Sequence, residues 1–165
     1  MKKTSVTALF CLMMCSITLS TMAQGQSGTE TGPRPENEMY VVLQDAGFIK
    51  TLNQKARTFK PKEAEIQLAL KVFKEAVVNH NNREMVKAVA AEMLNIIQQE
   101  SFYKQLIPYR IGKEKFIYFN CLCSPHGEEW KNKVIEVDGG YRCYFQVIVN
   151  LSKKTSDGIF FNGIL

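Results

Sequence analysis

The sequence predicts an α+β domain in which N-terminal helices, forming a helical hairpin, pack on a C-terminal four-stranded antiparallel meander. Three observations lead to this fold class. Apolar residues recur every three or four positions through the middle of the chain, which is the helical period. From Cys143 to Asn150 side chains of different character alternate, and Asp138-Gly139-Gly140 is a typical hairpin turn. Helices grouped ahead of strands are typical of α+β domains.

The first expected element is a helix over 38–58. Its apolar residues, among them Met39 and Ile49, are spaced by three and four positions, and Asn37 suits the N-cap. Gly47 lies inside this pattern and is a point at which the helix could divide.

The first helix of the hairpin is expected to begin near Pro61, because proline suits a first helical turn. An apolar stripe from Ile66 to Val77 follows at helical spacing. The polar run 79–82 (NHNN) consists of residues that favour turns, so we expect the helix to end there.

The second helix of the hairpin is expected to start at the same run. Asn81 and Glu84 have the spacing of a capping box, and a long apolar stripe follows them. The pattern continues to about Lys104, and Pro108 is expected to end it. The short link predicts that the two helices lie antiparallel.

Strand-like sequence follows Gly112, with loops expected over 121–131 and 153–158. The turn at 138–140 joins the second and third of these runs. The four predicted strands are Phe116–Phe119, Val134–Val137, Cys143–Leu151 and Ile159–Phe161.

Residues 1–23 have the layout of a cleavable secretory signal. Two lysines precede an apolar run over 6–19, and small residues lead to a cleavage site between Ala23 and Gln24. The apolar run is shorter than the ~20 residues that span a bilayer. We therefore expect a secreted or periplasmic protein with no membrane span, and the short signal is of bacterial type.

Two segments follow the signal. Residues 24–37 are polar and rich in Gly, Ser, Thr and Pro, which predicts a flexible leader. Residues 38–165 have the length of a single domain. Lipid attachment to Cys11 or Cys15 is an alternative to cleavage, although large apolar residues stand where that modification requires a small one.

The charge pattern bears on the class of partner. The formal net charge is +5, and acidic residues accompany the basic ones, as in Lys74-Glu75 and Arg83-Glu84. Such pairs are typical of a solvated helix surface, whereas nucleic-acid binding requires a dense basic patch. We expect a protein or another extracytoplasmic ligand as partner, no nucleic acid and no cofactor.

Cys121, Cys123, His126 and Cys143 form the densest group of reactive residues. The first interpretation is structural: Cys143 pairs with Cys121 or Cys123 in a disulfide, as exported proteins allow. The second is a zinc site built from all four residues, although the Cys-x-Cys spacing is tighter than usual. The third is redox catalysis, for which the usual Cys-x-x-Cys is missing.

The remaining candidates are aromatic. We expect Trp130 to fold back over the core, and an exposed Trp130 together with Tyr141 would instead form a contact surface. The sequence contains no metalloprotease, serine-hydrolase or phosphate-loop motif. We therefore expect a non-enzymatic binding domain, for instance an inhibitor of a hydrolase. The alternatives are a thiol- or zinc-dependent enzyme that uses the cysteine group, and a structural envelope component.

The C-terminal part of the chain has a recognisable pattern, which comprises Trp130, Asp138-Gly139-Gly140, Tyr144-Phe145, Asn150-Leu151 and Asn162-Gly163. This pattern resembles small secreted Bacteroidetes proteins of unknown function, which implies an exported bacterial protein and no particular activity. The order of helices before a meander is also similar to cystatin-like and NTF2-like folds, which host inhibitors, binding modules and enzymes alike.

Overall fold

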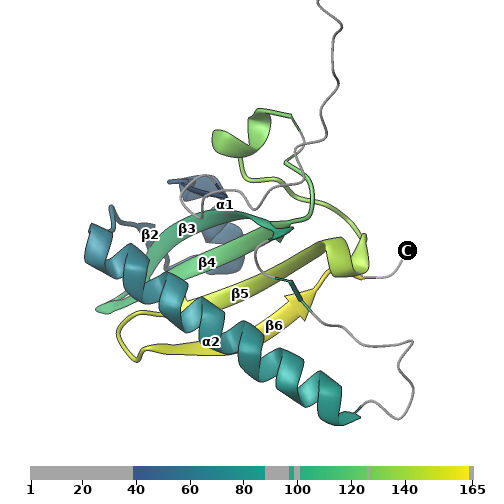
Figure 1. The fold of residues 1–165 in the computed structure, drawn as a ribbon. Coiled ribbons are helices and arrows are strands. Elements are labelled where there is room, and N and C mark those ends of the chain that lie inside the picture. The colour runs from purple at the N-terminus through teal and green to yellow at the C-terminus, as the bar shows by residue number, and fades with distance from the viewer. Residues whose placement is uncertain (1–38, 88–96, 99–100, 126, 164–165) are drawn as a thin grey trace, which may run out of the picture. The chain divides into compact units, whose positions relative to one another are not determined.

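A six-stranded mixed sheet and one long helix dominate the part of the chain that the structure describes (Figure 1). The structure is a computed structural model, and it describes residues 39–87, 97–98, 101–125 and 127–163. The predicted fold class, a helical hairpin on a four-stranded antiparallel meander, is therefore wrong. The elements are β1 (Tyr40–Val42), α1 (Ala46–Leu52), β2 (Arg57–Thr58), α2 (Glu63–Lys87), β3 (Tyr103–Ile111), β4 (Glu114–Leu122), η4 (Glu129–Lys131), η5 (Tyr141–Cys143), β5 (Tyr144–Asn150) and β6 (Thr155–Phe161).

The strand order is β1-β3-β4-β5-β6, and β2 also pairs with β3. β1 runs parallel to β3, with Val41 opposite Gln105, and β2 runs antiparallel to it, with Thr58 opposite Tyr109. The other pairings are antiparallel. β1 and β2 thus both pair with the same side of β3, although α1 separates them in the sequence.

This arrangement explains why Pro108, predicted to end a helix, lies in the middle of β3. The amide of Lys104 donates to Met39 O at 2.7 Å, and the carbonyl of Leu106 accepts from Leu43 N at 2.9 Å. Alternate residues therefore direct their backbone groups towards β1, and Pro108 belongs to that set. β1 is registered with β3 up to Leu106, and β2 only from the residue after Pro108. The missing N–H consequently falls in the gap between the two short strands.

The N-terminal helix predicted over 38–58 is replaced by β1, α1 and β2. The β-branched pair Val41 and Val42 finds a partner strand in β3. α1 starts only after Asp45, whose side chain accepts from Phe48 N at 2.8 Å as an N-cap. Spacing by three and four residues is therefore not sufficient to predict a helix here, because the first of these residues pair with the edge of β3 instead.

α2 continues through the predicted break at 79–82 to Lys87. Asn81 donates to Ile97 O and accepts from Ile97 N, both at 2.9 Å, so its amide holds the chain where it returns to the sheet. His80 lies against the ring of Phe161, with 5.5 Å between the centroids. These tertiary contacts occupy the polar side chains that would otherwise favour a turn. The predicted second helix falls partly at 88–96 and 99–100, outside the described residues, and its last part is strand β3.

Two of the predicted strands, in β4 and β5, are confirmed, and the last strand is longer than predicted because β6 begins at Thr155. The segment 134–137 is not a strand. The turn predicted at 138–140 leads into the short helix η5 rather than closing a hairpin, with Gly139 and Gly140 at φ angles of 84° and 80°.

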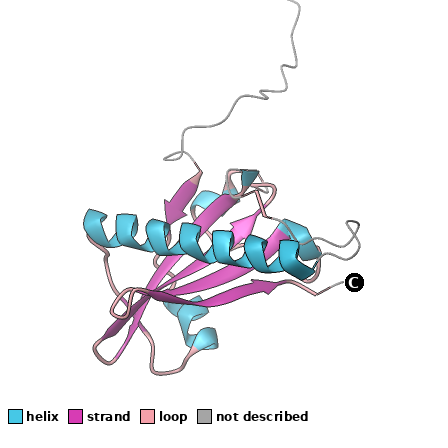
Figure 2. Cartoon of the chain, turned by 60° about the horizontal axis from the view of Figure 1, so that its bottom comes forward, coloured by secondary structure: helices cyan, strands magenta, loops and turns pink. Residues whose placement is uncertain are grey.

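The sheet has two faces of different construction. α2 lies across the first face (Figure 2), where Phe73 stacks on Phe119 with 4.7 Å between the ring centroids. α1 lies on the second face and covers part of it. Another part is covered by the middle of a second stretch, residues 123–125 and 127–143, which we call the covering segment. The buried apolar cluster of the second face comprises Leu43, Ile49, Ala56, Ile107, Tyr109 and Val134.

Candidate functional site

Gln105 of β3 fastens the covering segment to the second face and is completely buried. Its Nε2 donates to the carbonyls of Trp130 and Lys133, both at 2.6 Å. Its Oε1 accepts from Ile135 N at 2.9 Å and from Asn120 Nδ2 at 3.0 Å. Every hydrogen-bonding position of this amide is therefore used inside the protein.

Asn120 of β4, opposite Gln105, is satisfied only in part. Its Nδ2 donates to Gln105 Oε1 and, at 2.7 Å, to Ile135 O, which uses both of its hydrogens. The residue is 4% exposed. No donor from the described residues reaches its Oδ1. Burying an acceptor without a donor costs about 1–3 kcal/mol, so this carbonyl marks the point where a ligand would be recognised.

Two more amides continue the row across β5 to the end of β6, and we call Gln105, Asn120, Gln146 and Asn162 the amide ladder. Gln146, opposite Asn120, donates from Nε2 to Asn162 Oδ1 at 2.6 Å. Asn162 in turn donates to Val137 O. Gln146 Oε1 has no donor among the described residues, so the ladder presents a second free acceptor.

A hollow of about 270 Å³ lies beside the amide ladder, between the sheet, α1 and the covering segment. Asn120 and Gln146 line it. Glu136 and Asp138 of the covering segment line it as well, and both are exposed. Asn162 is the third amide in the lining. The polar lining therefore includes three amides, two tyrosine hydroxyl groups and the two carboxylates at the rim.

Three aromatic side chains, Phe48, Tyr118 and Tyr144, also line the hollow. Phe48 meets Tyr118 edge to face, with 5.3 Å between the ring centroids. Burial raises the pKa of Tyr118 to about 12, and the negative charge of Glu136 adds to the effect. The phenol is protonated at neutral pH, as tyrosine ordinarily is, and its hydrogen is a donor.

Gly140 explains how Tyr144 reaches this position. A Cβ atom at Gly140 would lie 2.4 Å from a ring carbon of Tyr144, and the φ angle of the glycine is +80°. Both the close approach and the left-handed backbone require glycine. The glycines predicted to form a hairpin turn therefore bring the covering segment against the ring.

The cysteines separate between the two faces. Cys123 and Cys143 form a disulfide at the ends of the covering segment, with 4.9 Å between their Cα atoms. Cys121 is a buried thiol in the core beneath α2, and burial raises its pKa. The proposed zinc set is thus not brought together, and its fourth member, His126, lies outside the described residues. No group of three or more His, Cys, Asp or Glu side chains in the described ranges could hold a metal ion.

The other predicted site residues, Trp130 and Tyr141, pack against aromatic rings of the fold. Trp130 is 3% exposed and packs edge-on against Tyr103 at 5.2 Å, so its ring belongs to the covered part of the second face. Tyr141 is half-buried near Phe161, 5.8 Å away. Trp130 thus lies folded against the sheet, and the alternative, an exposed Trp130 that forms a contact surface with Tyr141, is not present. The cleavage residues Ala23 and Gln24 lie outside the described residues.

Sequence reasoning did not find the residues that line the hollow. The sequence does contain one indication of this site. Each of the three strand segments has an amide side chain among mostly apolar residues, namely Gln105, Asn120 and Gln146. An amide inside such a run predicts a buried partner or a ligand. The sequence alone could not show that the three lie in one row, because that depends on the register of β3, β4 and β5.

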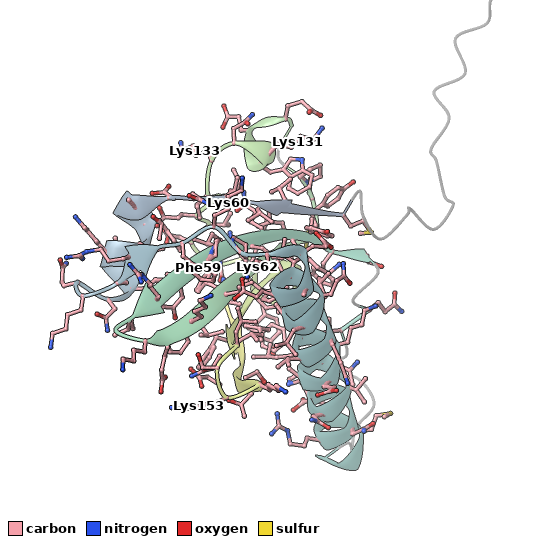
Figure 3. All side chains as sticks on the ribbon, turned by 90° about the vertical axis from the view of Figure 1, so that its left-hand side faces the viewer. Phe59, Lys60, Lys62, Lys131, Lys133 and Lys153 are labelled. Atoms are coloured by element: carbon pink, nitrogen blue, oxygen red, sulfur yellow. A yellow bond between two sulfur atoms is a disulfide. The ribbon has the colours of Figure 1, made fainter. Side chains whose placement is uncertain are left out.

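Several lysines lie on the surface outside the lining of the hollow. Figure 3 shows Lys131 and Lys133 on the covering segment, Lys60 and Lys62 ahead of α2, and Lys153 on the turn after β5. These lysines come from separate parts of the fold. The lining of the hollow contains no lysine or arginine.

Comparison with known proteins identifies no relative of this chain. No protein-family model matches the chain, and neither a curated protein sequence nor a solved structure matches it significantly. Within the described ranges, no helix is both long enough and apolar enough to cross a membrane.

Proposed function

We propose that this protein is an exported, non-enzymatic binding domain and that its ligand enters the hollow on the second face. The observation that carries the proposal is the Asn120 carbonyl, a buried acceptor that receives no donor from the described residues. A ligand that supplies the donor removes the cost of burying this group.

The size of the hollow favours a small ligand group. Pockets for drug-sized molecules measure about 300–1,000 Å³, and this hollow measures about 270 Å³. It accommodates a small solute or a single side chain of a partner protein. The hydrolase-inhibitor version of the proposal corresponds to the second case.

The chemistry of the lining supports binding rather than catalysis. It contains no cysteine, serine, histidine or lysine, and its two carboxylates, Glu136 and Asp138, are exposed at the rim. The pKa of Tyr118 is raised to about 12, so its phenol is protonated at neutral pH and does not act as a base there. The disulfide between Cys123 and Cys143 is typical of proteins that work outside the cytoplasm.

The proposal is tested by titrating the labelled protein with four solutes and following Asn120 and Gln146 by NMR. The solutes are glucose, 1,5-pentanediol, cadaverine and Nα-acetyl-lysine methylamide, which carry different donors. We expect saturable shifts at the side-chain amides of both residues from at least one solute. If none of the four produces them, the proposal is wrong.

Two variants and a control assign the binding to the hollow. Asn120→Leu removes the buried acceptor, and Gln146→Met removes its half-buried neighbour at lower risk to folding. Both should weaken binding by about tenfold, equivalent to about 1.4 kcal/mol. Gln67→Met, on the exposed side of α2, should leave it unchanged. Equal loss in all three variants would exclude the hollow as the site.

A further inference from the structure

The charge at the hollow is negative on a chain that is positive as a whole. Glu136 and Asp138 line the hollow, and no basic side chain does. Lys133 of the covering segment lines a neighbouring depression together with the acidic residues Glu129, Glu136 and Asp138. The local field therefore favours a cationic group although the formal net charge is +5.

The aromatic lining favours a cation as well. Phe48, Tyr118 and Tyr144 surround the same space as the two carboxylates. The face of an aromatic ring attracts an ammonium group, and several rings around one site are a common way to hold such a cation. Phe48 and Tyr118 contact each other edge to face within this lining.

The amide carbonyls decide which cation fits. Asn120 Oδ1 and Gln146 Oε1 need hydrogen-bond donors, and a quaternary ammonium group has no N–H to give them. A protonated primary amine has three donors and no acceptor. It satisfies both carbonyls and leaves its third hydrogen for a carboxylate at the rim.

We infer that the hollow binds a protonated primary amine on an alkyl stem, held by Asn120, Gln146 and the carboxylates of Glu136 and Asp138. This inference rests on the proposed function, because it names the ligand class of the same site. The same head group occurs in a free diamine and in a lysine side chain of a partner protein. In both cases the stem lies against Phe48 and Tyr144.

The experiment measures dissociation constants of matched probes by calorimetry. Cadaverine and 1,5-pentanediol have the same carbon chain and differ in their end groups, so their ratio isolates the ammonium. We expect cadaverine to bind about tenfold more tightly. Nα-acetyl-Nε-trimethyl-lysine methylamide should bind about tenfold more weakly than its unmethylated parent, since methylation removes the N–H groups.

Charge-neutral variants locate the effect. Glu136→Gln and Asp138→Asn should each weaken cadaverine binding several-fold and leave pentanediol unchanged. Glu128→Gln is the matched control, because Glu128 lies on the same covering segment, pairs with Lys131 at 2.6 Å and does not line the hollow. It should leave both probes unchanged.

The outcomes separate this inference from the proposed function. Pentanediol or glucose binding as tightly as cadaverine would overturn the amine and leave the binding site in place. A trimethylated probe that binds more tightly than its parent would overturn the primary amine. If none of the probes binds, the proposed function fails with the inference. Binding of the lysine derivative without cadaverine supports the inference and identifies a partner's lysine as the source.

Discussion

The two faces of the sheet are closed by different means. On the first face a single helix covers apolar side chains, and the rings of Phe73, Phe119 and Phe145 form a continuous stack. On the second face an irregular segment is held by the amide of Gln105 and by a disulfide. From this contrast we infer that the two faces have different roles. Apolar burial on the first face supplies most of the stability, and the second face contains polar groups that a packed core would exclude.

The largest expected effect comes from the first face. Phe73 is 1% exposed and lies in the centre of the ring stack. Phe73→Ala should lower the free energy of unfolding by about 4 kcal/mol, because it removes a buried ring and leaves a cavity. The half-buried Phe48 of the second face is the control, and Phe48→Ala should cost less than half as much in urea denaturation. Equal losses would contradict the division between the faces.

The disulfide is the second test. It closes a loop with a sequence separation of 20 residues, so replacing both Cys123 and Cys143 by serine should cost about 3 kcal/mol. Hydrogen exchange should then rise in the covering segment more than in β4 and β5. Cys121→Ser tests the buried thiol of the first face separately, and it should leave exchange in the covering segment unaltered. Uniform loss of protection after removing the disulfide would show that the two faces unfold as one unit.

A smaller effect is expected from the amide ladder. Gln105→Leu keeps the size of the side chain and deprives two carbonyls and the amide of Ile135 of their partners. The cost should be about 2 kcal/mol, since buried groups lose hydrogen bonds. The amide of Ile135 should exchange faster. Gln67→Leu on the exposed surface of α2 is the control and should remain within about 0.5 kcal/mol. Unchanged exchange at Ile135 would mean that other contacts hold the covering segment.

The smallest expected effect is a surface ion pair beside the first face. Lys115 Nζ lies 2.7 Å from Glu65 Oε1, and this contact together with the backbone of Lys62 lowers the pKa of Glu65. A lowered pKa in the folded state stabilises the protein above the pKa of the unfolded chain, and the contribution disappears as the pH falls. Glu65→Gln should therefore cost about 0.5 kcal/mol at pH 7, and the cost should shrink as the pH falls through the lowered pKa of Glu65. Glu75→Gln, on the exposed side of α2, is the control. A cost that is independent of pH would contradict the electrostatic explanation.

The local sequence correctly predicted the elements in which the spacing of apolar residues along the chain matches the residues that are buried. The stripe from Ile66 to Val77 is buried as expected, and β4 and β5 lie where β-branched and aromatic residues predicted strands. In these elements intrinsic preference and tertiary packing agree. The cysteine spacing also narrowed the pairing to two choices, of which the structure has Cys123 with Cys143.

The errors arose where a distant part of the chain decides the local structure. Asn81 stays helical because its amide binds the backbone of Ile97, sixteen residues away. The segment at 134–137 has strand-forming residues, but the side chains of Gln105 and Asn120 take up the backbone groups of Ile135. The hollow could not be predicted for the same reason, because its lining comes from α1, two strands, the covering segment and the end of β6.

Pro108 also affects how the sheet can associate with other chains. The border that β1 and β2 form is divided into pieces of three and two residues, with the proline between them. The opposite border, β6, is irregular where its register shifts near Val147 and Val149 and where Gly158 has a φ angle of +105°. A growing fibril needs a long, regular row of unpaired amides and carbonyls as its template. Neither border supplies one, so the sheet resists extension by further copies of itself.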